Sequence, residues 1–147
     1  MNVPSSSTAT TLQVHRTFAA SREKVFRAWT DPEMLKKWMA PADDFAVPTV
    51  EVDLRVGGRY RIVMRGPDGK DNIAVGAYRE IQPPERLVFT WTWEGSGMPD
   101  TLVTIELRAQ GESTEVVLTH ERFPTAETCE HHKQGWVACL TRLAKAL

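Results

Sequence analysis

The feature of this sequence that most constrains its fold is a repeated alternation of apolar and other residues. In the segment LVFTWTW, residues 87–93, every second side chain is large and apolar. A period of two places these side chains on one face of a β-strand. We predict six further strands, at residues 11–18, 50–54, 60–64, 73–81, 103–107 and 116–121. Tight-turn sequences such as PDGK lie between successive strands, which favours an antiparallel sheet.

Three other segments have the spacing of helices. The first is expected over residues 22–30, and the second begins at Pro32 and ends at Pro41. Thr125 is a suitable N-cap for the third helix, which is expected to run to residue 147. Its apolar positions are separated by three, four or seven residues, as expected for a helix with one buried face. They are Cys129, Trp136, Leu140, Leu143 and Leu147.

The order of these elements predicts an α+β fold. One strand, two short helices, six strands and one long helix follow one another. The apolar face of the sheet has to be covered, and the long helix is the element able to cover it. We therefore predict a single domain over residues 11–147, with a curved antiparallel sheet wrapped around the C-terminal helix. Residues 1–10 are polar, without the features of a signal peptide, and are expected to form a flexible tail.

Charge and cysteine content exclude several classes of protein. The net charge of −1 provides no general attraction to nucleic acid, and we expect no nucleic-acid partner. No apolar stretch approaches the roughly 20 residues that span a bilayer. Cys129 and Cys139 would lie about 15 Å apart along one helix, too far for a disulfide. Two free thiols are typical of a reducing compartment, so we predict a cytoplasmic protein.

No metal or catalytic motif stands out. His131 and His132 are neighbours on a helix, so their side chains point about 100° apart and do not converge with Cys129 on one ion. The sequence contains no HExxH, phosphate-loop or Ser–His–Asp pattern. We predict neither a metal site nor a cofactor, and catalysis has no support from these motifs.

Several motifs in a consistent order resemble the START-like (SRPBCC) superfamily, in the branch related to the activator of the heat-shock chaperone ATPase. They are FAASREKVFRAWTDPEMLKKWMAP, VDLRVGGRYRIVMRGPDGK, IQPPERLVFTWTW, LTHERF and the Gly135-Trp136 pair. The resemblance implies a helix-grip fold with a cavity between the sheet and the long helix. Many relatives carry two tryptophans where this chain has Trp38-Met39, a difference expected to reshape one end of that cavity.

Eight side chains are expected to face the space between the sheet and the long helix. If that space is open, they form a ligand site with apolar walls and few polar groups. The alternative is that the large rings fill the core. His120 and His132 could supply a polar contact or an acid–base group, or could be bonded to the protein itself. The eight residues are Tyr60, Met64, Phe89, Trp91, Trp93, His120, His132 and Trp136.

The leading hypothesis is a cytoplasmic protein that binds a small hydrophobic or aromatic ligand. The resemblance leaves two alternatives open: a co-chaperone-like interaction module active in the stress response, and a cavity enzyme of the cyclase or hydrolase type using His120 or His132. The chaperone activators carry an additional docking domain, which counts against the first alternative. The oligomeric state is expected to be a monomer or homodimer.

Overall fold

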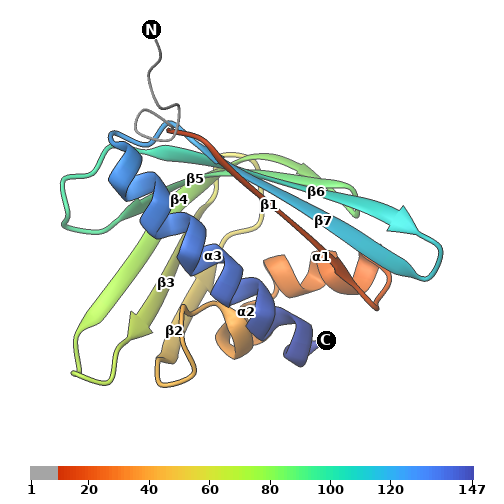
Figure 1. Cartoon of the computed structure of the whole chain (residues 1–147), viewed down its shortest axis with the longest axis horizontal. Helices are drawn as coiled ribbons and strands as arrows, with labels where there is room; N and C mark the ends of the chain where they lie inside the picture. The colour runs from red at the N-terminus through yellow and green to blue at the C-terminus, as the bar shows by residue number, and fades with distance from the viewer. Residues whose placement is uncertain (1–9) are drawn as a thin grey trace, which may run out of the picture.

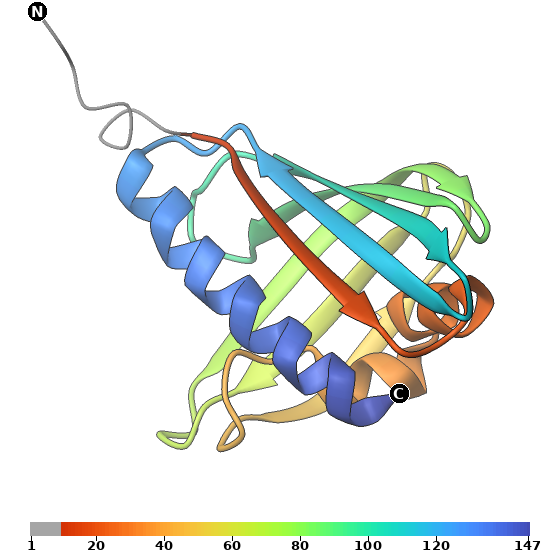
Figure 2. The ribbon, with the colours of Figure 1, turned by 45° about the vertical axis from the view of Figure 1, so that its right-hand side comes forward.

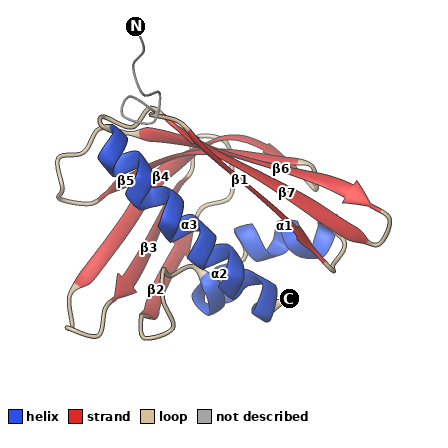
Figure 3. Cartoon of the chain, in the orientation of Figure 1, coloured by secondary structure: helices blue, strands red, loops and turns tan. Residues whose placement is uncertain are grey.

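The structure, a computed structural model, describes residues 10–147. The predicted flexible tail therefore lies outside the described residues, except for Thr10. All ten predicted elements are present, in the predicted order (Figures 1 and 3). They are β1 (Leu12–Phe18), α1 (Arg22–Thr30), α2 (Pro32–Trp38), β2 (Ala46–Val52), β3 (Arg59–Arg65), β4 (Asp71–Gln82), β5 (Arg86–Trp93), β6 (Thr101–Gln110), β7 (Ser113–Glu121) and α3 (Ala126–Ala146).

The seven strands form one antiparallel sheet, in the order β1-β7-β6-β5-β4-β3-β2. Five of the pairings join strands that are consecutive in the chain, and β1 returns to pair with β7. The sheet curves without closing, and α3 lies across its concave side (Figure 2). The α+β helix-grip prediction is confirmed.

The two short helices fill one end of the concave side. The Ser21 hydroxyl accepts a hydrogen bond from the backbone N–H of Lys24, which begins α1. The Asp31 carboxylate accepts from the N–H of Glu33 and begins α2, with Pro32 in the first turn. Both caps satisfy N–H groups that a helix start leaves without partners. α1 and α2 thus turn sharply against each other and hold Trp29 and Trp38 in the core.

α3 is capped and buried as its sequence predicts. The Thr125 hydroxyl accepts from the N–H of Thr128, and the helix continues to Ala146. Its inner face packs on the sheet and on α2, within one hydrophobic cluster that also includes α1. The buried residues of α3 are Cys129, Trp136, Cys139, Leu140 and Leu143. Both cysteines are free.

Several boundaries differ from the sequence prediction, among them the start of β2 at Ala46 and the ends of β2 and α2. β2 ends at Val52, so Leu54, predicted as its last inward residue, lies in the following turn and is 43% exposed. α2 ends at Trp38, before Pro41, because Met39 leaves the helical conformation. Within residues 10–147, no helix is long and apolar enough to cross a membrane.

Candidate functional site

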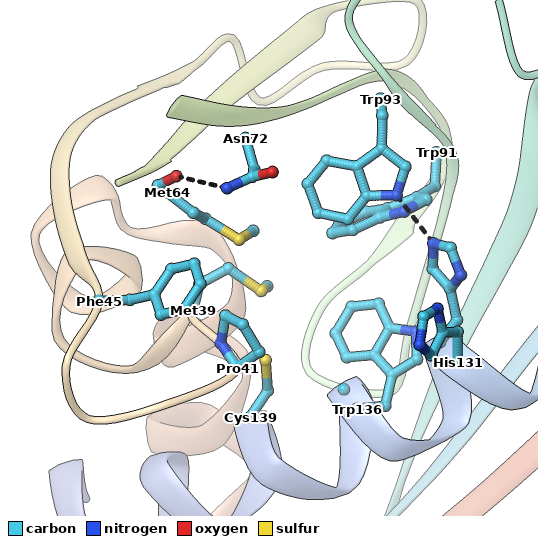
Figure 4. A pocket seen from close by; sticks show the side chains of 12 residues that line it. Met39, Pro41, Phe45, Met64, Asn72, Trp91, Trp93, His131, Trp136 and Cys139 are labelled. Carbon is cyan, nitrogen blue, oxygen red and sulfur yellow. Dashed lines mark hydrogen bonds between the residues drawn. The ribbon is translucent and has the colours of Figure 1, made fainter. Parts of the chain in front are cut away.

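A pocket of about 540 Å³ opens between α3, the segment after α2, and strands β3 to β5 (Figure 4). Most of its lining is apolar, and its polar side chains are one asparagine and two histidines. The lining residues are Met39, Pro41, Phe45, Met64, Asn72, Trp91, Trp93, His131, His132, Gly135, Trp136 and Cys139.

Five of the eight residues predicted for the site line this pocket: Met64, Trp91, Trp93, His132 and Trp136. The other three lie behind its wall. Tyr60 and Phe89 pack edge to face, with ring centroids 5.5 Å apart. His120 is fully buried behind Trp91 and Trp136. Three of the predicted side chains thus belong to the core and do not reach the open space.

Tyr60 illustrates why some inward residues become core. Its hydroxyl donates a hydrogen bond to the carbonyl oxygen of Thr90 on β5, passing over Gly76 on β4. A Cβ at Gly76 would lie 2.7 Å from the Tyr60 hydroxyl and 1.9 Å from the Thr90 oxygen. Only glycine fits so close a crossing. Tyr60 is consequently held flat against the sheet, and burial raises the pKa of its hydroxyl.

One wall of the pocket consists of indole rings from β5 and α3. The ring centroids of Trp91 and Trp93 are 5.4 Å apart, and the two planes are nearly perpendicular. Trp91 also contacts Trp136 of α3, at 5.1 Å between centroids. Aromatic side chains at such separations attract each other beyond their hydrophobic burial. The indoles thus join the sheet to the helix while exposing part of their surface to the pocket.

His132 holds Trp93 in this wall. The indole N–H of Trp93 donates to Nε2 of His132 at 2.9 Å. Nδ1 of His132 lies 2.9 Å from the carbonyl oxygen of Thr128 and must be its donor, since a carbonyl only accepts. His132 is therefore neutral with the proton on Nδ1, and burial lowers its pKa. Neither ring nitrogen is left for a ligand.

Both ring nitrogens of His120 are likewise hydrogen-bonded to the protein. Its Nδ1 accepts from the indole N–H of Trp136 at 2.9 Å, and its Nε2 lies 2.6 Å from the Thr101 hydroxyl. That hydroxyl donates to the Trp91 carbonyl, so it must accept from Nε2 of His120. This series of hydrogen bonds, from Trp136 through His120 to Thr101, requires the imidazole ring of His120 to be neutral. Burial lowers the pKa of His120 to about 2.

Two polar side chains of the lining are exposed, Asn72 on β4 and His131 on α3. The Asn72 amide nitrogen makes a long contact, 3.5 Å, with the Met64 carbonyl. Figure 4 shows the Asn72 amide oxygen turned away from Met64, toward the indoles. Among the predicted residues, the Trp91 indole N–H is buried and has no hydrogen-bond partner. Free hydrogen-bonding capacity thus lies with Trp91 and with Asn72 and His131, which were not predicted, and not with His120 or His132.

Gly135 marks a place where the helix backbone itself borders the pocket. A Cβ at this position would meet nothing within 4 Å. A glycine inside a helix costs roughly 0.5–1 kcal/mol relative to alanine. No neighbouring atom excludes a side chain at this position. The glycine leaves the pocket larger than an alanine would.

For some of the other lining residues that were not predicted, the sequence contains a pattern that could have placed them at the pocket. Gly135 and Cys139 follow His132 at helical spacing, three and seven residues on, so they share its face of α3. Met39 was expected to shape one end of the cavity, and it lines the pocket. Pro41 and Phe45 lie in an irregular segment with no period to follow.

The buried thiol of the lining is poorly suited to nucleophilic chemistry. The Cys139 thiol donates to the carbonyl of Ala40, and burial raises its pKa to about 12, so it stays protonated. A thiol is a poor nucleophile in that form. Among residues 10–147, no three histidine, cysteine or acidic side chains cluster in a way that could hold a metal ion.

The sequence profile of the family described as "Activator of Hsp90 ATPase homolog 1-like protein" matches residues 19–147. No protein in the curated set matches the chain significantly.

Several solved bacterial structures share the fold over nearly the whole chain. Protein CV1439 from Chromobacterium violaceum is 33% identical, with a TM-score of 0.85, and the match covers 92% of this chain and 95% of that one. Protein NE0264 from Nitrosomonas europaea is 27% identical, with a TM-score of 0.80 and 94% of each chain covered. The AHSA1 protein SPO3351 from Silicibacter pomeroyi is 26% identical, with a TM-score of 0.82 and coverage of 92% and 95%.

Proposed function

The chain belongs to the Activator of Hsp90 ATPase homolog 1-like family, and we propose that it binds a small, largely apolar molecule in the pocket between α3 and the sheet. The family agrees with the branch that the sequence motifs resemble, and its fold is that of the START-like superfamily. Fold and family do not by themselves select a function, so the proposal depends on the site.

The observation that carries the proposal is a pocket with apolar walls that the protein's own side chains leave unfilled. Its volume of about 540 Å³ is within the usual range for small-molecule sites. Apolar walls in contact with water are unfavourable, and an apolar guest would remove part of that contact. Gly135 supports the same interpretation, because a larger residue there would fill space that a ligand can use.

A protein-interaction role is the second candidate, supported by a different surface. Leu54 and Val56, in the turn between β2 and β3, are 43% and 65% exposed. The family description also names a chaperone ATPase activator. Cytoplasmic location, a role in stress and a chaperone partner remain predictions for this chain.

The test of ligand binding compares two helix variants. Gly135→Leu would place a side chain in the pocket, whereas Val137→Leu changes an exposed residue on the same helix. We expect the neutral fluorescent probe N-phenylnaphthylamine to bind the wild-type protein and Val137→Leu equally, and Gly135→Leu at least tenfold more weakly.

Binding should also stabilise the fold, by about 2.7 kcal/mol at a hundredfold excess of probe over Kd. The unfolding midpoint without probe serves as the folding control for both variants. Equal binding to Gly135→Leu and wild type would place the probe elsewhere. Absence of binding to the wild type would favour the interaction role.

A further inference from the structure

We propose that the ligand of this pocket is a neutral, planar aromatic molecule with a hydroxyl group that donates a hydrogen bond to Asn72. This inference rests on the proposed function and adds the chemical class of the ligand. Three features of the lining carry it: two facing walls of different chemistry, the absence of charge, and the orientation of one amide.

The two walls both favour a flat ring over an aliphatic chain. Figure 4 shows the indoles of Trp91, Trp93 and Trp136 on one side, and Met39, Met64 and Cys139 on the other. Indole faces attract aromatic rings in stacked or edge-to-face arrangements. Thioether sulfur makes favourable contacts with aromatic rings that it does not make with saturated carbon. A planar ring system between these walls gains from both.

Apart from the exposed His131, the lining has no side chain that could pair with an ionised ligand. None of its twelve residues is lysine, arginine, aspartate or glutamate. His132 cannot serve as a cation without losing its hydrogen bond from Trp93, because Nε2 would then carry a proton that faces the indole N–H. A charged group taken from water into such surroundings is unfavourable unless it is paired. The ligand group inside the pocket is therefore neutral.

Asn72 supplies a specific polar contact. Its amide nitrogen faces the Met64 carbonyl, so the amide oxygen is the atom turned toward the indoles (Figure 4). An amide oxygen accepts hydrogen bonds and cannot donate them. The complementary ligand group is a donor, and a hydroxyl on the edge of an aromatic ring meets the requirement without introducing charge.

Three matched compounds separate these features. They are hydroxyphenanthrene, the fully hydrogenated alcohol with the same carbon skeleton, and phenanthrene carboxylate. We expect hydroxyphenanthrene to bind at least tenfold more tightly than either of the others, measured by tryptophan fluorescence and thermal shift. Equal binding of the saturated alcohol would overturn the aromatic requirement. Equal binding of the carboxylate would overturn the requirement for a neutral ligand.

The Asn72 contact is tested with a variant and a fourth compound. Asn72 is exposed, so Asn72→Ala should leave the fold intact. In the wild type, hydroxyphenanthrene should bind at least fivefold more tightly than unsubstituted phenanthrene. Asn72→Ala should abolish that preference, because it removes the amide oxygen that accepts from the hydroxyl. A preference that survives in Asn72→Ala would show that the hydroxyl contacts another group.

The failures of the two proposals are distinguishable. If N-phenylnaphthylamine and all four phenanthrene compounds fail to bind, the pocket is no ligand site and both proposals fall. If the saturated alcohol and the carboxylate bind as well as hydroxyphenanthrene, a ligand site remains and only its proposed chemical class is wrong.

Discussion

His120 and His132 show how a residue type associated with function can serve structure instead. Each ring accepts an indole N–H, from Trp136 and Trp93 respectively. Each donates its own proton to oxygen, so no ring nitrogen is left unpaired. Buried polar groups are costly unless they are paired in this way. The two histidines therefore set the positions of two tryptophans in the pocket wall.

The buried state of His120 predicts a pH dependence of stability. Its pKa is lowered to about 2 in the folded protein, from an ordinary value of 6.5. As pH falls below about 6.5, the unfolded chain takes up a proton at this residue that the folded protein does not. The free energy of unfolding should then decrease, by roughly 1 kcal/mol between about pH 7.5 and pH 5.5 from His120 alone.

Urea unfolding at the two pH values measures this loss. His132, whose pKa is also lowered, should add to it in the same direction. His120→Gln keeps an acceptor and a donor but does not titrate, so its loss of unfolding free energy should be smaller than that of wild type by roughly 1 kcal/mol. A His120 ring proton whose NMR shift titrates near neutral pH would contradict the prediction directly.

α3 is the element on which the rest of the fold depends, because it covers the concave face of the sheet (Figure 2). Leu143 is fully buried on its inner face, whereas Val137 on its outer face is 48% exposed. We predict that Leu143→Ala lowers the free energy of unfolding by about 2–5 kcal/mol, since it leaves a cavity in a packed core. Val137→Ala should change it by less than about 0.5 kcal/mol.

Chemical denaturation of the two variants tests how α3 is docked. A loss under about 0.5 kcal/mol for Leu143→Ala would mean that the helix does not cover the sheet as described. Nearly equal losses for the two variants would mean that both faces of the helix are buried, which is inconsistent with the exposure of Val137.

Periodic elements were predictable, and their irregular ends were not. Strand alternation and helical spacing give all ten elements of the fold, and the caps Ser21, Asp31 and Thr125 give the helix starts. The end of β2 was predicted wrongly, because Leu54 continues the alternation although the chain has already begun to turn. Alternation predicts which face of a strand each side chain would occupy. A turn can end the strand before the alternating pattern ends.

At the scale of the whole molecule, the position of the pocket depends on distances that the sequence does not contain. Inward register placed Tyr60, Phe89 and His120 in the candidate site, but the depth of each is set by neighbours from other strands. Gly76, for example, lets Tyr60 lie flat behind the wall. Phe45 reaches the pocket from an irregular segment, so no pattern could predict it. The sequence predicted the space between helix and sheet, and tertiary packing decides which part of it is open.

The indoles connect all layers of the described fold and predict a single cooperative unfolding transition. Trp29 of α1 contacts Trp38 of α2 at 4.7 Å between ring centroids, and Trp136 of α3 at 5.9 Å. Trp136 in turn contacts Trp91 of β5 at 5.1 Å. Loss of any one layer would expose rings of the next, so the layers should unfold together. A single compact domain of this size usually behaves in this way.

Urea denaturation followed by two probes tests this cooperativity. Circular dichroism in the far ultraviolet reports the backbone of helices and strands, and tryptophan fluorescence reports the packing of the indoles. We expect the two midpoints to coincide in the wild type, and to shift together in Leu143→Ala because that change weakens the contact between α3 and the sheet. Two separate transitions, with helical signal lost before the fluorescence changes, would show instead that α3 detaches while the sheet and the short helices remain folded.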